Sequence, residues 1–316
     1  MLNALKRVSL ALALSSTAFS TQAAELATPL SKVKYAENMA KANGKVYVTT
    51  DGAVHVLSGQ GNQWQHQPVP ATYRNGQSVA DCTFGGITTV RSHVYAVCTD
   101  KAAAVHLFVL DSLAQQPAFS EVTLPENTLI TGVKIANGLS SNGNDQLYLA
   151  DHGAPLLPGK IVRLTLSGSH NLASQATLHR FTGCKPNGVK FHNGKLYVTL
   201  NPFSYVGLSQ LYRYDISNDG LKNGKPLYSA WSFLDDFTLV NDGFLIADYM
   251  GGRVVHIKED GSQSGTALTE PVLPSSVTLS DEGHILVTWR QSSLIATGET
   301  GSVHVYDSPW GALTLR

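Results

Sequence analysis

The chain has 316 residues, with an apolar fraction of 43% and a charged fraction of 15%. This composition suits one large or two ordinary packed domains and argues against a disordered chain. Lysine plus arginine balance aspartate plus glutamate at 23 each, so no basic surplus favours binding to nucleic acid or to an anionic membrane.

The N-terminus has the pattern of a secretory signal peptide, residues 1–23. Lys6 and Arg7 form a positive stretch, Val8 to Phe19 is a short apolar run, and Thr21 and Ala23 sit three residues and one residue before the predicted cut. An uncleaved anchor helix is disfavoured because the apolar run is short and contains several serines. We therefore expect a periplasmic or secreted protein with no membrane anchor after cleavage.

Six strand-like runs, each alternating or β-branched, recur along the rest of the chain. They are KVYVTT from Lys45, HVYAVC from His93, QLYLAD from Gln146, KLYVTL from Lys195, FLIADY from Phe244 and HILVTW from His284. Each is followed by a second run across turn residues. The second runs are AVHVL from Ala53, AVHLFVL from Ala104, KIVRLTL from Lys160, QLYRYDI from Gln210, RVVHI from Arg253 and SVHVY from Ser302.

A third run precedes each pair and opens with polar or small residues. The openings are Glu37-Asn38-Met39, Gly85-Gly86-Ile87, Asn137-Gly138-Leu139, Asn187-Gly188-Val189, Asp235-Asp236-Phe237 and Ser275-Ser276-Val277, separated by 48, 52, 50, 48 and 40 positions. A period near fifty with about four strands per unit is typical of a propeller blade. An ordinary β-sandwich does not explain one opening repeated six times. The sequence therefore predicts an all-β fold, a single six-bladed β-propeller over residues 24–316.

Two further features concern the closure of the ring and the cysteines. Either Leu26–Lys34 or the tail Ala312–Leu315 is expected to supply the outer strand that closes the ring. Cys82 and Cys98 flank one predicted strand pair and can form a disulfide in an oxidising compartment, which leaves Cys184 as a thiol. The spacing of the cysteines fits no zinc site.

The innermost strand of each blade runs along the central channel, so the six openings should meet near one mouth of it. Their first residues are Glu37, Gly85, Asn137, Asn187, Asp235 and Ser275. Two carboxylates and two carboxamide oxygens together suit Ca²⁺ first, with Mg²⁺, Mn²⁺ or an open Zn²⁺ site as alternatives. A divalent cation would also remove the repulsion between the two negative charges.

Structural interpretations of the same residues stay open at this point. They are turn signals at Asn137 and Asn187, a loop-end carboxylate at Asp235, a solvated side chain at Glu37, a turn residue at Asp236, and a surface or supporting histidine at His152.

The openings ENM, ANGL, PNGV and DDF, with DGFLIADYMGGRVVHI after the last, resemble the gluconolactonase, senescence-marker protein and luciferin-regenerating enzyme family of six-bladed propellers. The resemblance extends from Tyr35 to about Asp307. It implies one metal held by Glu37, Asn137, Asn187 and Asp235. Many family members have Glu-Gly-Pro at the first opening, and no match is found to the arginine and second acidic residue that hold sugar lactones in the animal members. The resemblance therefore supports the metal site more strongly than it supports a sugar lactone as the substrate.

These observations together predict a metal-dependent hydrolase that acts on a lactone or similar small ester at the channel mouth. The cation would polarise the carbonyl, and Asp235 or Asp236 would take the proton. The absence of a Gly-X-Ser-X-Gly elbow disfavours a serine hydrolase. Two alternatives are a non-hydrolytic enzyme related to strictosidine synthase or to propeller lyases, and a cell-envelope binding propeller with a structural metal. The expected partner is a small-molecule substrate.

Overall fold

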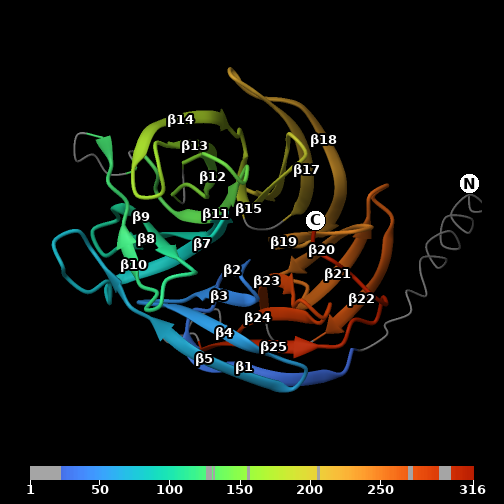
Figure 1. Cartoon of the computed structure of the whole chain (residues 1–316). Coiled ribbons are helices and arrows are strands. Elements are labelled where there is room, and N and C mark those ends of the chain that lie inside the picture. Colours follow the sequence, from blue (N-terminus) through green and yellow to red (C-terminus); the bar gives the residue numbers. More distant parts are fainter. Residues whose placement is uncertain are drawn as a thin grey trace, which may run out of the picture.

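The structure is a computed structural model, and it describes residues 23–125, 130, 132–154, 157–204, 207–269, 273–291 and 300–316. Its described secondary structure consists of strands arranged as six sheets around a central axis. In Figure 1 the first strand of each sheet lies nearest the axis and the last lies at the periphery. The predicted six-bladed β-propeller with four antiparallel strands per blade is therefore confirmed.

The first three blades follow one another along the chain. Blade 1 contains β2 (Met39–Ala42), β3 (Lys45–Thr49), β4 (Val54–Gln60) and β5 (Gln63–Val69). Blade 2 contains β7 (Cys82–Val90), β8 (His93–Asp100), β9 (Val105–Asp111) and β10 (Phe119–Glu121), with the short β6 (Ala71–Thr72) added parallel to β10. Blade 3 contains β11 (Ala136–Ser141), β12 (Gln146–Asp151), β13 (Lys160–Leu166) and β14 (Leu172–Arg180).

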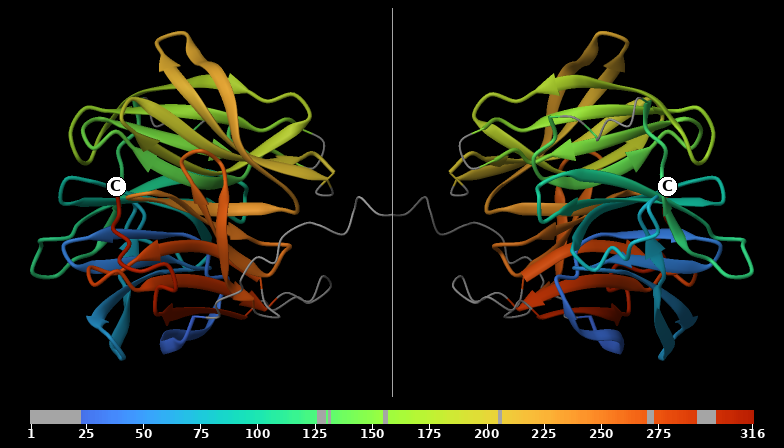
Figure 2. Two further views of the ribbon diagram at one scale, coloured as in Figure 1. Left: turned by 90° about the vertical axis from the view of Figure 1, so that its right-hand side faces the viewer. Right: turned by 90° about the vertical axis from the view of Figure 1, so that its left-hand side faces the viewer.

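The remaining three blades complete the ring. Blade 4 contains β15 (Cys184–His192), β16 (Lys195–Pro202), β17 (Leu208–Ser217) and β18 (Gly220–Trp231), and the hairpin of its last two strands projects from the body in the side views of Figure 2. Blade 5 contains β19 (Leu234–Val240), β20 (Gly243–Asp248), β21 (Arg253–Lys258) and β22 (Gln263–Thr269). Blade 6 contains β23 (Leu273–Leu279), β24 (Ile285–Gln291), β25 (Thr300–Tyr306) and β1 (Glu25–Lys34).

The N-terminal strand closes the ring, as one of the two predicted possibilities. β1 pairs antiparallel with β25, and Ala24 O accepts a hydrogen bond from Asp307 N at 3.0 Å. The C-terminal tail instead runs along blade 5, where Leu315 forms an isolated bridge with Val240. Residues 1–22, on which the signal-peptide prediction falls, lie outside the described part of the chain.

The hydrophobic core is divided among the six interfaces between blades, which hold one cluster each. β12 shows how the sequence produces this arrangement. Leu147 and Leu149 pack toward blade 2, while Tyr148 and Ala150, one residue out of phase, pack toward blade 4. Both faces of the sheet are covered, so a nearly continuous apolar run is stable there although it would be unsuitable for a sheet with one wet face.

The predicted disulfide is also confirmed. Cys82 in β7 and Cys98 in β8 are bonded, with their Cα atoms 5.7 Å apart. Cys184 is a free, half-buried thiol, and burial raises its pKa. Among the described residues no helix is long and apolar enough to cross a bilayer.

Candidate active site at the channel mouth

Each predicted blade opening coincides with a break in the pairing of the innermost strand. The ladder between the first two strands skips residues at Gly85-Gly86, Asn137-Gly138, Asn187-Gly188, Asp235-Asp236 and Ser275, and Glu37-Asn38 lies at the same point of blade 1. Such β-bulges bend a strand and re-aim a side chain. The repeated sequence motif therefore marks a repeated backbone device at one end of the channel.

Glycine as the second bulge residue lets neighbouring innermost strands touch. A Cβ atom on Gly138 would lie 2.4 Å from the carbonyl oxygen of Asn187. A Cβ atom on Gly188 would lie 2.8 Å from Oδ1 of Asp236. Both separations are shorter than a side chain tolerates, so the absent Cβ atoms allow the openings of blades 3, 4 and 5 to lie against one another.

Threonine hydroxyls connect successive openings. Thr199 Oγ1 accepts from Gly188 N at 2.7 Å and donates to the carbonyl oxygen of Asp235, in the next blade, at 2.7 Å. Thr288 Oγ1 lies 3.0 Å from the carbonyl oxygen of Glu37 across the junction of blades 6 and 1. The three threonines placed in this way are Thr49, Thr199 and Thr288.

Carboxylate and carboxamide side chains at the ends of the second strands hold the segments that lead into the openings. Asn201 donates from Nδ2 to Leu234 O at 2.8 Å and accepts from Leu234 N at 2.9 Å, which fixes the residue directly before Asp235. Asp151 Oδ1 accepts from Ile135 N at 3.1 Å, two residues before Asn137. The backbone on which these two site residues stand is therefore firmly positioned.

The four predicted metal ligands lie at these bulges, and three of them are almost fully buried. Glu37, Asn187 and Asp235 are 3%, 2% and 3% exposed, and Asn137 is half-buried. Oδ1 of Asn137, of Asn187 and of Asp235 each accept no hydrogen bond from the described residues. Burying an acceptor without a partner is costly, and three such oxygens at consecutive openings fit a hard cation. The described residues contain no metal-binding group of three or more His, Cys, Asp or Glu side chains.

The two adjacent aspartates of blade 5 have different surroundings. Lys190 Nζ lies 2.8 Å and 2.9 Å from the two carboxylate oxygens of Asp236, and Ser276 Oγ donates to Asp236 at 2.9 Å. No described residue places such a counter-charge beside Asp235. Burial and the negative charge of Asp236 raise the pKa of Asp235 well above the usual range of an aspartate. A hydrogen bond between Asp235 and Asn187 opposes that shift. The two predicted catalytic residues therefore differ in their counter-charge and in their hydrogen-bond partners.

Glu37 is balanced by a residue that the sequence reasoning missed. Its carboxylate forms an ion pair with Arg290, which is 6% exposed and lies in β24 of blade 6. Arg290 Nε donates to Ala36 O at 3.2 Å, and its guanidinium carbon lies 3.8 Å from the centre of the Tyr35 ring. Lys190 was missed as well. No sequence signal distinguishes either residue, because both meet the site only through the closed ring.

A cavity of about 260 Å³ adjoins two of the predicted ligands. Its lining residues come from blades 1, 2 and 3 and the segment before blade 1: Tyr35, Glu37, Thr83, Gly85, Thr99, Asp100, Ile135, Ala136 and Asn137. A second cavity of about 280 Å³ is lined by all six innermost strands and by the C-terminal Leu315 and Arg316, and Lys190 faces it. The first cavity is large enough for a small ring compound beside Glu37 and Asn137.

His152 is buried beside the opening of blade 4. Its Nδ1 lies 3.2 Å from Pro186 O, and its ring centre lies 6.1 Å from that of Phe233. Burial, helped by the charge of Lys185, lowers the pKa of His152 to about 4. The histidine therefore stays neutral at ordinary pH and supports the backbone next to Asn187.

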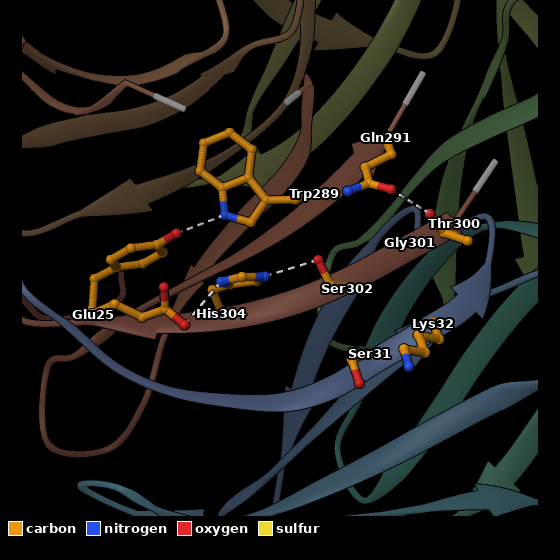
Figure 3. Close-up of a pocket in the computed structure, with 10 residues that line it drawn as sticks. Glu25, Ser31, Lys32, Trp289, Gln291, Thr300, Gly301, Ser302 and His304 are labelled. Carbon is orange, nitrogen blue, oxygen red and sulfur yellow. Dashed lines mark hydrogen bonds and ion pairs between the residues drawn. The ribbon is translucent and has the colours of Figure 1, made fainter. Parts of the chain in front are cut away.

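The cavity in Figure 3, about 510 Å³, lies on blade 6 and includes none of the predicted ligands. His304 Nε2 lies 2.9 Å from Ser302 Oγ, and its Nδ1 lies 3.0 Å from a carboxylate oxygen of Glu25. Ser302 pairs with Trp289 of β24, whereas the ladder to β1 has a register shift at this point. We assign these residues no part in catalysis.

Comparisons with known proteins extend the description of the fold. No protein-family model matches the sequence, and no curated protein matches it. A gluconolactonase from Xanthomonas campestris superposes with a TM-score of 0.59 at 14% identity, over 88% of each chain. The calcium-binding protein regucalcin from Agrobacterium tumefaciens superposes with a TM-score of 0.56 at 11% identity, over 90% of this chain and 96% of that one.

A nidogen/laminin complex gives a TM-score of 0.55 at 11% identity, over 78% of this chain and 88% of that one. Identities this low establish a likeness of fold and leave the activity to be argued from the site. The chain is thus a six-bladed β-propeller that resembles in structure the gluconolactonase and regucalcin propellers, in keeping with the resemblance seen in its sequence motifs.

Proposed function

We propose that this protein is a metal-dependent hydrolase acting on a lactone or similar small ester at the mouth of the propeller channel. The observation that carries the proposal is the set of buried oxygens at consecutive openings, Oδ1 of Asn137, Asn187 and Asp235, which accept no hydrogen bond from the described residues. The likeness in fold to a gluconolactonase and to a calcium-binding regucalcin supports the same assignment.

The donor set favours one kind of cation. Asn137, Asn187, Asp235 and Glu37 offer only oxygen ligands, and two of the four are neutral carboxamides. Such a set suits Ca²⁺ best, while Mg²⁺, Mn²⁺ and Zn²⁺ remain the alternatives to be tested.

The reaction would depend on the environment of each carboxylate. A bound divalent cation supplies polarisation of the substrate carbonyl and activation of water. Asp235 would accept the proton released by the attacking water, because burial and Asp236 raise its basicity. Asp236 would be held beside Asp235 by Lys190 and Ser276. The 260 Å³ cavity next to Glu37 and Asn137 would orient the substrate.

We also propose that the protein acts outside the cytoplasm. A cut after Ala23 leaves the whole of β1, which begins at Glu25 and closes the ring, in the mature chain. The Cys82–Cys98 disulfide is of the kind that forms and persists in an oxidising compartment. N-terminal sequencing of the exported protein should begin at Ala24 or Glu25, and a mature chain that still carries Lys6 and Arg7 would rule out this localisation.

One experiment tests the hydrolase proposal directly. Purified protein is analysed for bound elements and assayed on a panel of lactones and aryl esters, before and after treatment with a chelator. In a buffer that contains excess Ca²⁺ we expect one equivalent of bound divalent cation, loss of hydrolysis on chelation and recovery when Ca²⁺ is returned. Hydrolysis that persists in the fully metal-free protein would refute the metal dependence, and a blank panel with metal bound would refute the hydrolase.

One observation favours a second candidate. Arg290 already balances Glu37, so part of the site is electrostatically satisfied by the protein itself. This suits a binding propeller of the cell envelope in which a cation, if bound, only joins the blades. The same metal analysis and activity panel separate the two candidates, because the binding propeller retains metal without hydrolysing any substrate.

A further inference from the structure

The ion pair between Glu37 and Arg290 occupies one of the four predicted ligands. Glu37 is 3% exposed and Arg290 is 6% exposed, so neither charge is solvated by bulk water. A buried carboxylate needs a compensating charge, since removal of one partner of such a pair is strongly destabilising. In the structure Arg290 supplies that charge.

Arg290 is held in place by contacts that do not involve Glu37. Its Nε donates to Ala36 O at 3.2 Å. Its guanidinium carbon lies 3.8 Å from the ring centre of Tyr35 and 5.9 Å from that of Tyr249, both within cation–π range. The guanidinium therefore has a reason to remain beside Glu37 whether or not another cation is present.

We propose that Arg290 is a resident counter-ion of the channel mouth that competes with the divalent cation for Glu37 and so sets the affinity of the site. This inference rests on the proposed function, because it concerns the same cation site. The blade openings carry three carboxylates, Glu37, Asp235 and Asp236, and Arg290 and Lys190 pair with Glu37 and Asp236. A divalent cation thus meets a site with about one net negative charge instead of two.

The expected consequence is weak binding. Sites with few uncompensated charges bind Ca²⁺ at about 10⁻⁴–10⁻³ M, the range of extracellular modules. Such an affinity is adequate outside the cell, where the protein is proposed to act, and it would leave the protein metal-free in a calcium-poor compartment.

The test is a double-mutant cycle read by calorimetric titration of Ca²⁺ into chelator-treated protein. We expect Arg290→Met to lower the dissociation constant about tenfold or more, because Glu37 is then free to bind the cation. In the Glu37→Gln background the same substitution should change it by less than about twofold. Arg253→Met is the matched control, since Arg253 pairs with the buried Asp248 at 2.7 Å in blade 5, and it should leave Ca²⁺ affinity unchanged.

Thermal unfolding keeps the test decisive if Arg290→Met is unstable. That variant should unfold earlier than the native protein without Ca²⁺ and gain more in melting temperature when Ca²⁺ is added. Should it not fold at any Ca²⁺ concentration, Arg290→Lys decides. A lysine loses the planar contact with Tyr35 and the guanidinium fork, so it should bind Ca²⁺ several-fold more tightly than the native protein.

The outcomes separate this inference from the proposed function. Tighter binding in Arg290→Met that disappears in the Glu37→Gln background supports the inference. A native protein that binds Ca²⁺ no more weakly than the Arg290 variants overturns the inference and leaves the cation-dependent function standing. Binding by Arg290→Met but not by the native protein supports the inference and removes the metal dependence of the native enzyme. No binding by any variant overturns both.

Discussion

The two sides of the channel mouth have the same β-bulges and threonine bridges, but they differ in whether their carboxylates are paired with a cationic side chain. At the junction of blades 4 and 5, the hydroxyl of Thr199 bridges the bulge of blade 4 and the carbonyl of Asp235. The Oδ1 atoms of Asn187 and Asp235 accept no hydrogen bond from the described residues. At the junction of blades 6 and 1, Thr288 ties the bulge to the carbonyl of Glu37, whose carboxylate is paired with Arg290.

This difference separates what builds the ring from what gives it chemistry. The hydroxyl bridges satisfy backbone groups at three of the six junctions, through Thr49, Thr199 and Thr288. In the proposed function, reactivity depends on Oδ1 of Asn137, Asn187 and Asp235, which accept no hydrogen bond from the described residues and lie on the side of blades 3, 4 and 5. The carboxylate of Glu37, on the other side, contacts Arg290. Variants that disturb one side and spare the other should therefore have unequal effects.

The largest expected effect is that of Asp235→Asn compared with Glu37→Gln. Asp235→Asn keeps the shape and removes the carboxylate that, among Glu37, Asp235 and Asp236, has no described counter-cation, so Ca²⁺ affinity should fall by about 100-fold or more and hydrolysis should be lost. Glu37→Gln should lower Ca²⁺ affinity only about tenfold, because Arg290 already offsets that charge. Calorimetry and the ester assay measure both.

The control for this comparison is Asp219→Asn, an exposed carboxylate on the β17–β18 hairpin. It should change neither affinity nor activity. Equal losses in Asp235→Asn and Glu37→Gln would contradict the asymmetry between the two sides. Full metal content in Asp235→Asn would exclude Asp235 from the site.

Removal of the Cys82–Cys98 disulfide should have a large effect on stability and none on the site. Blade 2 opens with Gly85-Gly86 and brings no ligand side chain, so the bond acts only on the fold. Its 16-residue separation corresponds to about 3 kcal/mol of unfolding free energy in the loop-entropy model. Urea unfolding of the Cys82→Ser/Cys98→Ser double variant measures the loss, and Cys184→Ser is the control. A matching fall in Ca²⁺ affinity would mean that blade 2 belongs to the site.

Much of this architecture was predictable because each blade repeats the same short sequence pattern, which depends only on local structure. Each opening needs small or polar residues for a bulge, and each second strand must be apolar on both faces, so the motif recurs at a fixed period. The six openings, from Glu37 to Ser275, lie where the repeat predicted. The N-terminal closure was one of two possibilities, because both segments read as short strands.

The counter-charges were beyond sequence reasoning for a physical reason. Arg290 reaches Glu37 only because the ring closes, and its hydrogen bond to Ala36 joins residues 254 positions apart. Lys190 meets Asp236 across a blade boundary in the same way. A pattern read along one strand indicates which face a residue takes, but not which residue of the neighbouring blade opposes it. The different surroundings of Asp235 and Asp236 could therefore not be predicted from the sequence.

Low pH should destabilise the fold at blades 3 and 4, because His152 is buried there in its neutral form. The pKa of this histidine is lowered to about 4 in the folded protein, compared with about 6.5 in the unfolded chain. Above pH 6.5 the side chain is neutral in both states, and the folded protein has its full stability. The contribution of neutral His152 is lost as the pH falls from 6.5 toward 4, and it amounts to up to about 3 kcal/mol. His152→Gln should unfold in urea with a flatter pH dependence over this window. His170→Gln, at an exposed site, should leave the dependence unchanged, and a native slope in His152→Gln would contradict the assignment.

The smallest effects should come from the two threonine bridges, Thr199→Val and Thr288→Val. Each substitution keeps the volume and leaves buried backbone groups without a partner, so each should cost about 1–3 kcal/mol of unfolding free energy. The ring tolerates such a change, because the residues opposite the bulges of blades 2, 3 and 5 are already apolar: Val97, Ala150 and Ala247.

The two variants should differ in what they do to the site. Thr199→Val frees the carbonyl of Asp235 and lets the carboxylate shift, which should weaken Ca²⁺ binding about tenfold, as the loss of a supporting contact does at other metal sites. Thr288→Val should change it by less than about twofold, because Arg290 still fixes the Glu37 side chain. Urea unfolding and Ca²⁺ titration of the matched pair measure the two effects separately. Equal weakening of Ca²⁺ binding in both variants would contradict the proposed difference between the two sides of the mouth.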